Sequence, residues 1–407
     1  MDTHHPHRAG DEVRWHAGAP APPPLELRPE SAITTSWHGE EPVVSVLCPT
    51  YQHSDFIEDA LRGILGQVTP FPFELIVRDD GSTDGTADIV ADFTDRYPNI
   101  IRALLEPENR WRQLRPSMRS HARGRFIARC DGDDYWIDPR KLETQVDTLE
   151  RSLDAVLSHH QAMVIQEGRI VRERRLPTDH CRDYTQAELI RAKLAIASTM
   201  LHRNLPLEEH PKREQILNRD TLSLAQLGEH GGAKWEPDLL PTVYRMHAGG
   251  MWSTQDPVQR DIDAVRSYYW IGWYFLDRDR EVAHHFLGRG LAWYLRGCTD
   301  AGADLAAVLA QNDHLARPLV ELPREELPPS LRRLVDERDA AVRDRDDAVA
   351  QRDRIRTRYD RLRRRFAVRL ALRAARLARP LISLRRLVVR GRASAAVAMP
   401  KRTDSDA

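Results

Sequence analysis

The sequence has few cysteines, and their spacing pairs none of them. Cys48, Cys130, Cys181 and Cys298 lie far apart and form no C-x-x-C pair. This spacing argues against a zinc knot and a disulfide framework, and it favours a reduced, cytoplasmic setting. No apolar run reaches the roughly 18 residues that a transmembrane helix needs. Residues 1–7 are not followed by an apolar core, so we do not expect a signal peptide.

The chain has no net charge, but its charges are distributed unevenly. Residues 361–407 hold 14 Lys and Arg against two Asp, a net charge of +12. Because the whole chain is neutral, residues 1–360 carry a net charge of about −12. We therefore expect the two parts to meet different partners. With 407 residues, 41% of them hydrophobic, the chain can bury a large core and form two or three domains.

Residues 1–41 show neither helical nor strand periodicity. They are rich in Pro, His and Gly and include a proline-rich run at residues 20–24. This composition predicts a disordered N-terminal tail over residues 1–41. The early histidines His4, His5 and His7 suggest metal binding, although a solvated run is the simpler interpretation.

From Pro42 onward, apolar runs of strand length alternate with segments of helical spacing. The expected strands are residues 43–48, 75–77, 100–105 and 126–130, and the expected helices are 55–65, 87–96 and 141–153. Residues 154–217 are less regular, with strand candidates at 155–157, 163–165 and 197–201. This alternation predicts an α/β fold, in which a mostly parallel sheet is flanked by helices.

Two acidic turns follow predicted strands. Asp131, Asp133 and Asp134 come after the strand at 126–130, and a turn at residues 79–86 that begins Asp79-Asp80-Gly81 comes after the strand at 75–77. Carboxylates crowded in this way repel one another unless a cation is present, and oxygen ligands suit Mg²⁺ or Mn²⁺. The plain alternative is a pair of turns held by Asx hydrogen bonds. Because ligands bind beyond the carboxyl ends of such strands, we expect a shared site there.

These motifs carry a resemblance. Pro49-Thr50-Tyr51, the turn at 79–86, the Asp131-Gly132-Asp133-Asp134 motif and the segment 243–253 occur in the order and spacing of a family 2 glycosyltransferase. The similarity covers residues 42–255, which resemble the nucleotide-sugar half of an enzyme with the GT-A fold. The resemblance therefore implies a GT-A nucleotide-diphospho-sugar transferase domain over 42–255.

The resemblance also implies a role for each motif. The donor-binding residues would be Pro49, Thr50, Tyr51, Asp79, Asp80, Asp131, Asp133, Arg245, His247 and Trp252. The divalent cation, Mg²⁺ or Mn²⁺, would be held by Asp133, Asp134 and His247. Arg245 would help to order the site, and Trp252 would form a sugar platform or belong to the core.

Members of this family invert the anomeric centre, which requires one general base. Asp220 stands where the resemblance places that base, at the start of a helix. The same position also suits a helix N-cap or a first-turn acid. Many relatives have another acidic residue just before the base, whereas this chain has Arg219.

The C-terminal part changes character twice. Residues 256–325 are expected to form a helical extension with an aromatic cluster. In residues 326–361, Val335, Val342 and Val349 recur every seven residues, which predicts a charged helix or a weak coiled coil. A homodimer through residues 331–366 is one possibility. Arg338, Arg345 and Arg352 occupy the other core position of the heptad repeat, which weakens the predicted coiled coil.

Residues 362–393 combine an apolar helical stripe with flanking arginines, and residues 394–407 read as a disordered tail. A basic amphipathic helix is typical of segments that bind an anionic membrane surface, here the inner face of the membrane. Nucleic acid is disfavoured because the segment has no interleaved aromatics. Docking onto the acidic body is a third possibility.

The resemblance predicts an inverting transferase that moves a sugar from a nucleotide-diphosphate donor to an acceptor hydroxyl. The acceptor would be a saccharide or a lipid-linked molecule, in cell-surface polysaccharide or glycolipid synthesis. A nucleotidyltransferase is disfavoured because no glycine-rich phosphate loop with a basic residue lies near the first strand. A catalytically inactive scaffold or membrane-binding protein on the same fold is the remaining alternative.

Overall fold

The computed structural model describes residues 15–109, 118–191, 196–210, 213–250 and 257–300, together with residue 354. The chain divides into two units, residues 1–301 and 302–407, and the fold below is that of the first. The predicted coil at 326–361 (apart from residue 354), the basic helix at 362–393 and the tail at 394–407 lie outside the described residues.

A seven-stranded sheet forms the centre of the first unit, with strand order β3-β2-β1-β4-β8-β5-β9. Its pairs are parallel except those of β8, which runs antiparallel to both β4 and β5. The predicted mostly parallel sheet is confirmed. The strands are β1 (Val44–Thr50), β2 (Phe73–Asp79), β3 (Ile101–Leu105), β4 (Phe126–Arg129), β5 (Ala155–His159), β8 (Leu201–Arg203) and β9 (Gly232–Trp235).

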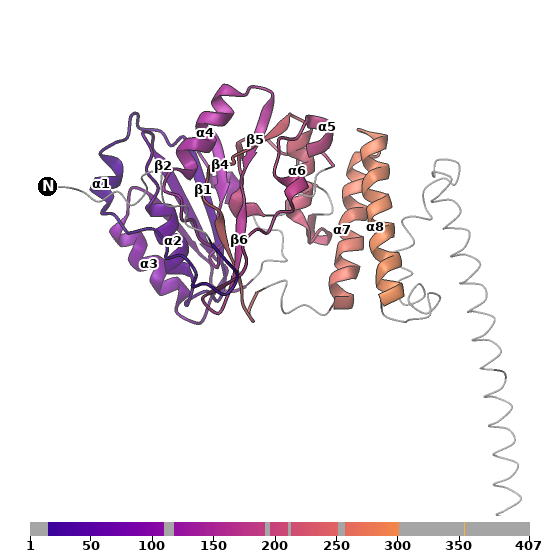
Figure 1. The fold of residues 1–407 in the computed structure, drawn as a ribbon, viewed down its shortest axis with the longest axis horizontal. Helices are drawn as coiled ribbons and strands as arrows, with labels where there is room; N and C mark the ends of the chain where they lie inside the picture. Colours follow the sequence, from indigo (N-terminus) through magenta and orange to yellow (C-terminus); the bar gives the residue numbers. More distant parts are fainter. Residues whose placement is uncertain are drawn as a thin grey trace, which may run out of the picture. The chain divides into compact units, whose positions relative to one another are not determined.

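Three helices pack on this sheet, two of them on its parallel half and the third on β5 and β8 (Figure 1). They are α2 (Ile57–Leu65), α3 (Thr86–Arg96) and α4 (Lys141–Arg151). Alternate residues of β1, namely Val44, Val46 and Cys48, are fully buried in the same cluster as Leu61 of α2. The apolar residues that recur at strand spacing in β1 and at helical spacing in α2 therefore pack in one core, as the sequence pattern predicts.

A second, three-stranded sheet joins distant parts of the chain. It has the order β10-β6-β7 and consists of β6 (Ala162–Gln166), β7 (Arg169–Arg172) and β10 (Thr242–Met246). We call residues 131–134, the loop that follows β4, the acidic loop. Tyr135, which follows it, exchanges backbone hydrogen bonds of 3.1 and 2.9 Å with Val243 of β10. This bridge places the residues that follow Val243 beside the acidic loop.

The predicted N-terminal tail is wrong from residue 15 onward. Pro20 bridges Arg169 at the edge of β7, and the Tyr135 hydroxyl donates to the Pro22 carbonyl at 2.6 Å. Helix α1 (Glu30–Thr34) buries Ile33, which is only 1% exposed. The segment shows no sequence periodicity because only isolated residues of it contact the rest of the domain.

The remaining helices lie beyond the sheet. They are α5 (Gln186–Leu189), α6 (Arg219–Gly228), α7 (Pro257–Phe275) and α8 (Arg280–Asp300). Helices α7 and α8 form a pair (Figure 1), and their buried face shares a cluster with Leu222 and Ala225 of α6. Residues 257–275 and 280–300 of the predicted extension are thus helical and support α6, whereas its residues 301–325 lie outside the described part of the chain. Among the described helices, none is both long and apolar enough to cross a membrane.

Four short 3-10 turns complete the described elements: Met118–His121, Thr178–His180, Ala197–Thr199 and Arg213–Gln215. The strand expected at 197–201 is therefore wrong over its first four residues, because strand β8 begins only at Leu201. The turn carries Ser198, whose side chain points to the acidic loop.

Candidate functional site

The ends of β1, β2 and β4 bring three predicted motifs to one edge of the sheet. Thr50 at the end of β1 pairs with Asp79 at the end of β2. The acidic loop after β4 lies against β1, because the Gly132 amide donates to the Pro49 carbonyl at 3.0 Å. A Cβ at Gly132 would lie 2.6 Å from the Thr50 Oγ1, so only glycine allows this approach.

The turn after β2 is held by its own side chains. Asp79 is buried and accepts from the amide (2.9 Å) and the hydroxyl of Ser82. Asp84 accepts from the Ser54 and Thr86 amides at 3.0 Å. Burial raises the pKa of Asp84, but these hydrogen bonds outweigh it and hold that pKa well below its usual range. The Asx interpretation therefore describes this turn correctly.

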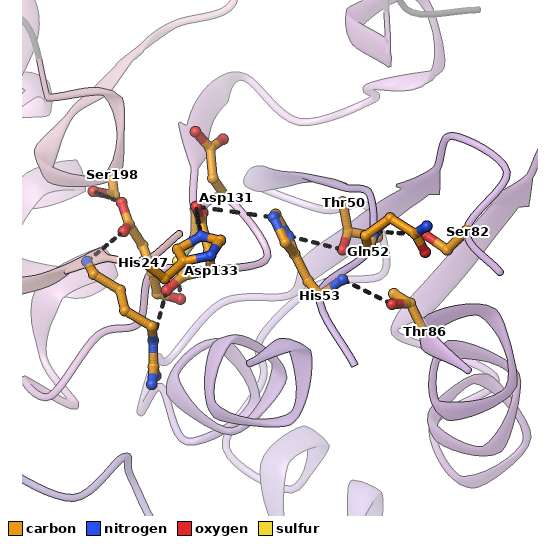
Figure 2. A network of polar contacts seen from close by, with 12 residues as sticks. Thr50, Gln52, His53, Ser82, Thr86, Asp131, Asp133, Ser198 and His247 are labelled. Atoms are coloured by element: carbon orange, nitrogen blue, oxygen red, sulfur yellow. Dashed lines mark hydrogen bonds and ion pairs between the residues drawn. The ribbon is translucent and has the colours of Figure 1, made fainter. Parts of the chain in front are cut away.

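The residues after β1 line the other side of that turn. The Gln52 amide donates to Ser82 Oγ at 2.8 Å, and the His53 amide donates to Thr86 Oγ1 at 2.9 Å (Figure 2). Tyr51 projects from this pair of loops with 41% of its surface exposed. Residues 51–53 and the turn at 79–86 thus form one connected rim, which carries Tyr51 and Asp80.

His53, Asp133 and His247 meet beside this rim (Figure 2). Asp133 Oδ2 lies 3.2 Å from His247 Nε2 and 3.9 Å from His53 Nε2. One donor atom from each residue lies within 4.8 Å of the others, so the three could hold a metal ion. Burial lowers the pKa of His53, although nearby Asp133 raises it. Burial raises the pKa of Asp133, but the imidazoles outweigh it and the net shift is downward.

The structure brings the predicted ligands Asp133 and His247 together, and it adds His53, which no sequence motif indicates. A lone histidine four residues before a helix carries no pattern of its own. Only the register of β1 against β4, which brings the loop after β1 beside the acidic loop, reveals it.

Predicted metal ligand Asp134 does not join this cluster. Its buried carboxylate accepts from Ser198 Oγ at 3.0 Å and from the Arg245 amide at 3.1 Å. Burial, followed by the charges of Asp133 and Asp131, raises the pKa of Asp134 well above its usual range. Asp134 thus anchors the loop to β10, because its oxygens already have partners on that side.

Arg245 orders the loop, as expected. Its Nε donates to the Asp133 carbonyl at 3.0 Å, and its Nη2 pairs with Asp59 of α2 at 2.7 Å. The guanidinium also lies 4.7 Å from the centre of the Phe56 ring. These contacts join α2, the acidic loop and β10. Because the Arg245 guanidinium is paired with Asp59, its charge is already neutralised within the protein.

Arg129 joins the acidic loop to α6. It donates to Asp131 Oδ1 at 2.6 Å and to Asp220 Oδ1 at 2.9 Å. The Asp220 side chain remains 45% exposed. Burial raises the pKa of Asp131, and the positive charge of Arg129 opposes that shift. The sheet edge and the start of α6 therefore present two carboxylates clamped by one guanidinium.

Asp220 does not cap α6. The N-cap residue is Asn218, and the amides of Leu217 and Asn218 donate to Ser267 Oγ of α7 at 2.9 and 3.1 Å. Asp220 stands in the first helical turn, where its carboxylate meets Arg129 instead of the backbone. Trp252, the predicted sugar platform, lies outside the described residues.

This chain resembles known proteins in sequence and in fold. Residues 45–205 match the profile of the family described as glycosyl transferase family 2. An uncharacterised protein of Mycobacterium bovis is 31% identical over 211 residues, which is 51% of this chain and 60% of the relative. The putative teichuronic acid biosynthesis glycosyltransferase TuaG of Bacillus subtilis is 38% identical over 119 residues, 29% of this chain and 45% of the relative. The chain thus spans about 60% of the first of these relatives.

Among solved structures, S. aureus TarS in complex with UDP-GlcNAc resembles this chain with a TM-score of 0.54 and 17% identity. The match covers 73% of this chain and 87% of the TarS chain. At this identity the similarity shows the fold, and the predicted GT-A fold is confirmed.

Proposed function

We propose that this chain, whose residues 45–205 belong to glycosyl transferase family 2, moves a sugar from a nucleotide-diphosphate donor to an acceptor hydroxyl with inversion at the anomeric carbon. One observation carries the proposal. Asp220, with an exposed carboxylate held by Arg129, stands at the same sheet edge as the acidic loop and the rim beside β1.

The rim formed by Tyr51, Thr50 and the turn at 79–86 is the proposed nucleoside site. Tyr51 offers an exposed ring for stacking on a base, and the side-chain hydrogen bonds beneath it hold the rim in place. Asp80 lies at the same rim, with its amide bonded to the Thr50 carbonyl at 3.1 Å. Asp79, which is engaged within the turn, supports this site from below.

Two side chains beside the rim, Asp133 and His247, are suited to bind a divalent cation. Asp133 and His247 offer a carboxylate and an imidazole whose facing atoms are 3.2 Å apart. We propose that these two residues hold Mg²⁺ or Mn²⁺, which would neutralise charge on the donor diphosphate. Asp134 contributes indirectly, because its bonds to Ser198 and Arg245 fix the loop that presents Asp133.

Asp220 is the proposed general base. Its carboxylate takes the proton of the acceptor hydroxyl while the acceptor oxygen bonds to the anomeric carbon. The bond from that carbon to the diphosphate oxygen breaks at the same time, and the nucleoside diphosphate leaves with the bonding electrons. Arg129 orients the base, because it grips one carboxylate oxygen and leaves the side chain nearly half exposed.

The proposed acceptor is a saccharide or a lipid-linked molecule of cell-surface polysaccharide synthesis. One relative supports this class by its name, the putative teichuronic acid biosynthesis glycosyltransferase TuaG. We propose a cytoplasmic enzyme that meets the inner face of the membrane through residues 362–393, which lie outside the described residues.

The full-length protein tests the proposal. Nucleoside diphosphates are screened for thermal stabilisation with and without Mn²⁺, and the matching nucleotide sugars are then assayed for release of nucleoside diphosphate. Asp220→Asn is expected to lower turnover by about 10²- to 10⁴-fold while nucleotide binding persists. Asp147→Asn, an exposed aspartate on α4, is the matched control.

Full turnover by Asp220→Asn would reject the assigned base. Neither binding nor turnover by the wild-type chain across the donor panel would reject the transferase itself, and would leave the inactive scaffold as the better description.

A further inference from the structure

His53 supplies a third donor atom to the cluster formed by Asp133 of the acidic loop and His247, which directly follows β10. It comes from a separate element, the loop between β1 and α2. Its Nε2 faces Asp133 Oδ2 at 3.9 Å, and its ring stands edge-on to that of His247 with centroids 5.8 Å apart. The two imidazoles therefore approach Asp133 from different parts of the chain.

The spacing fits a single ion. Ligand atoms that each lie about 2.1 Å from a metal are about 3 to 4.2 Å apart in common geometries. The contacts of Asp133 to His247 (3.2 Å) and to His53 (3.9 Å) fall within this range. The widest separation in the cluster is at most 4.8 Å, so a small side-chain adjustment would complete the site.

The orientation of His53 is fixed from behind. Its Nδ1 lies 3.2 Å from Thr50 Oγ1, and its backbone amide donates to Thr86 Oγ1 at 2.9 Å. Metal-bound histidines commonly have such a partner on the second ring nitrogen, which sets the ring direction. The ring also has little freedom, because its side chain is only 15% exposed.

We propose that His53 is a third protein ligand of the cation, so that two imidazoles and one carboxylate favour transition cations such as Mn²⁺ or Co²⁺ over Mg²⁺. The inference rests on the proposed function for the presence of a cation. Mg²⁺ prefers oxygen ligands and retains its waters, whereas imidazole ligands favour first-row transition metals. A site with oxygen ligands alone would accept Mg²⁺, and the two histidines therefore shift the cation preference of this site toward transition metals.

Binding of Mn²⁺ to the nucleotide-free, full-length protein tests this assignment. Free Mn²⁺ is measured by electron paramagnetic resonance during titration, and Mg²⁺ is then added as a competitor. The wild-type chain is expected to retain Mn²⁺ against a large excess of Mg²⁺. His53→Gln is expected to weaken Mn²⁺ binding by about tenfold or more. His38→Gln, an exposed histidine outside the cluster, should bind as the wild type does.

His53→Asp distinguishes lost ligation from lost folding. It keeps a ligand at this position but replaces imidazole with oxygen, so cation binding should persist while the preference for Mn²⁺ over Mg²⁺ narrows. Circular dichroism and thermal unfolding verify that each variant is folded.

Equal Mn²⁺ affinity in the wild type and His53→Gln would overturn the inference and leave the transferase proposal standing. Absence of Mn²⁺ binding by the nucleotide-free wild type would also overturn it, since three protein ligands should hold the ion without nucleotide. In that case a loss of nucleotide affinity in His53→Gln would assign His53 to the diphosphate instead. Failure of the transferase would be recognised separately, by absent donor binding and turnover.

Discussion

A lysine is buried directly beneath the acidic loop. Lys141, at the start of α4, has no exposed surface, and its Nζ donates to Gln145 Oε1 at 2.6 Å. The same ammonium lies 4.3 Å from the centre of the Trp136 ring. Trp136 in turn donates to the carbonyl of Ser198, whose hydroxyl meets Asp134. Burial lowers the pKa of Lys141 to about 7, so this support of the loop depends on pH.

Stability should therefore rise with pH through Lys141. Its folded pKa is about 7 and its ordinary value is 10.5, so between these values the unfolded chain binds the additional proton. The free energy of unfolding should then increase with pH in that window, by at most about 1.4 kcal/mol per pH unit. Denaturant unfolding at pH 7, 8 and 9 compares the wild type with Lys141→Met. The same dependence of the free energy of unfolding on pH in the two proteins would contradict this prediction.

At the residue scale, the sequence motifs indicate most of the residues of the proposed site. Asp133, His247 and Asp220 were predicted from motif order, and the structure brings the first two within 3.2 Å. Asp134 was expected at the metal, but its oxygens face Ser198 and Arg245. A motif gives the identity of a carboxylate, whereas the direction of its side chain depends on what packs around the loop.

Elements far from the motifs hold the site together. Segment 15–41 contributes α1, and Ile33 packs in the same core as β1 and α2. Nearby, Trp37 packs edge-to-face on Phe73 of β2 with ring centroids 5.4 Å apart. The segment is thus a structural part of the sheet that carries Thr50 and Asp79.

Ile33→Ala should destabilise the folded protein by about 2 to 5 kcal/mol, because it leaves a cavity in a closed core. Chemical denaturation monitored by tryptophan fluorescence measures the change. Glu40→Ala, an exposed position in the same segment, should stay within about 0.5 kcal/mol of the wild type. A neutral Ile33→Ala would mean that the segment does not contribute to the core.

One hydroxyl of α7 holds the start of α6, the helix that carries the proposed base. Ser267 is fully buried, accepts from the amides of Leu217 and Asn218, and donates to the Asp263 carbonyl at 2.7 Å. It thereby holds the start of α6, two residues before Asp220. Ser267 is a positioning residue in this interpretation, because it does not touch the acidic loop.

Ser267→Ala should lower kcat more than it changes KM for the donor, because α6 moves while the nucleoside rim does not. The two orphaned amides should also cost about 1 to 3 kcal/mol of stability each. Steady-state kinetics below the melting temperature separates the two effects. Ser267→Thr keeps the hydroxyl and should restore kcat, and Ser223→Ala on α6 is the control. A Ser267→Thr variant as slow as Ser267→Ala would refute the positioning role.

At the scale of the whole molecule, charge is separated along the chain. Residues 361–407 carry a net charge of +12 and the remainder about −12. Opposite charge on one chain favours contact with an anionic surface by one end only. That asymmetry matches an enzyme whose acceptor is lipid-linked, as proposed.

Vesicle sedimentation tests this asymmetry. The full-length chain should bind vesicles that contain an anionic lipid, and the binding should weaken as salt rises, because exposed charges are screened over about 8 Å at physiological ionic strength. A chain that ends at Asp360 should remain in solution, and neutral vesicles serve as the control. Equal sedimentation of the two chains would reject a membrane role for the basic end.

The sequence by itself determined the alternation of strands and helices, the family motifs and the order of the acidic turns, because periodicity and motif spacing are local properties. Tertiary structure decided what meets across long separations. Arg129 reaches Asp220 across 91 residues, and Asp133 reaches His247 across 114. The anchoring of residues 15–41, the turn of Asp134 away from the cluster and the arrival of His53 depend on strand register and packing. No local pattern encodes those, because each arises only when the sheet has brought distant loops to one edge.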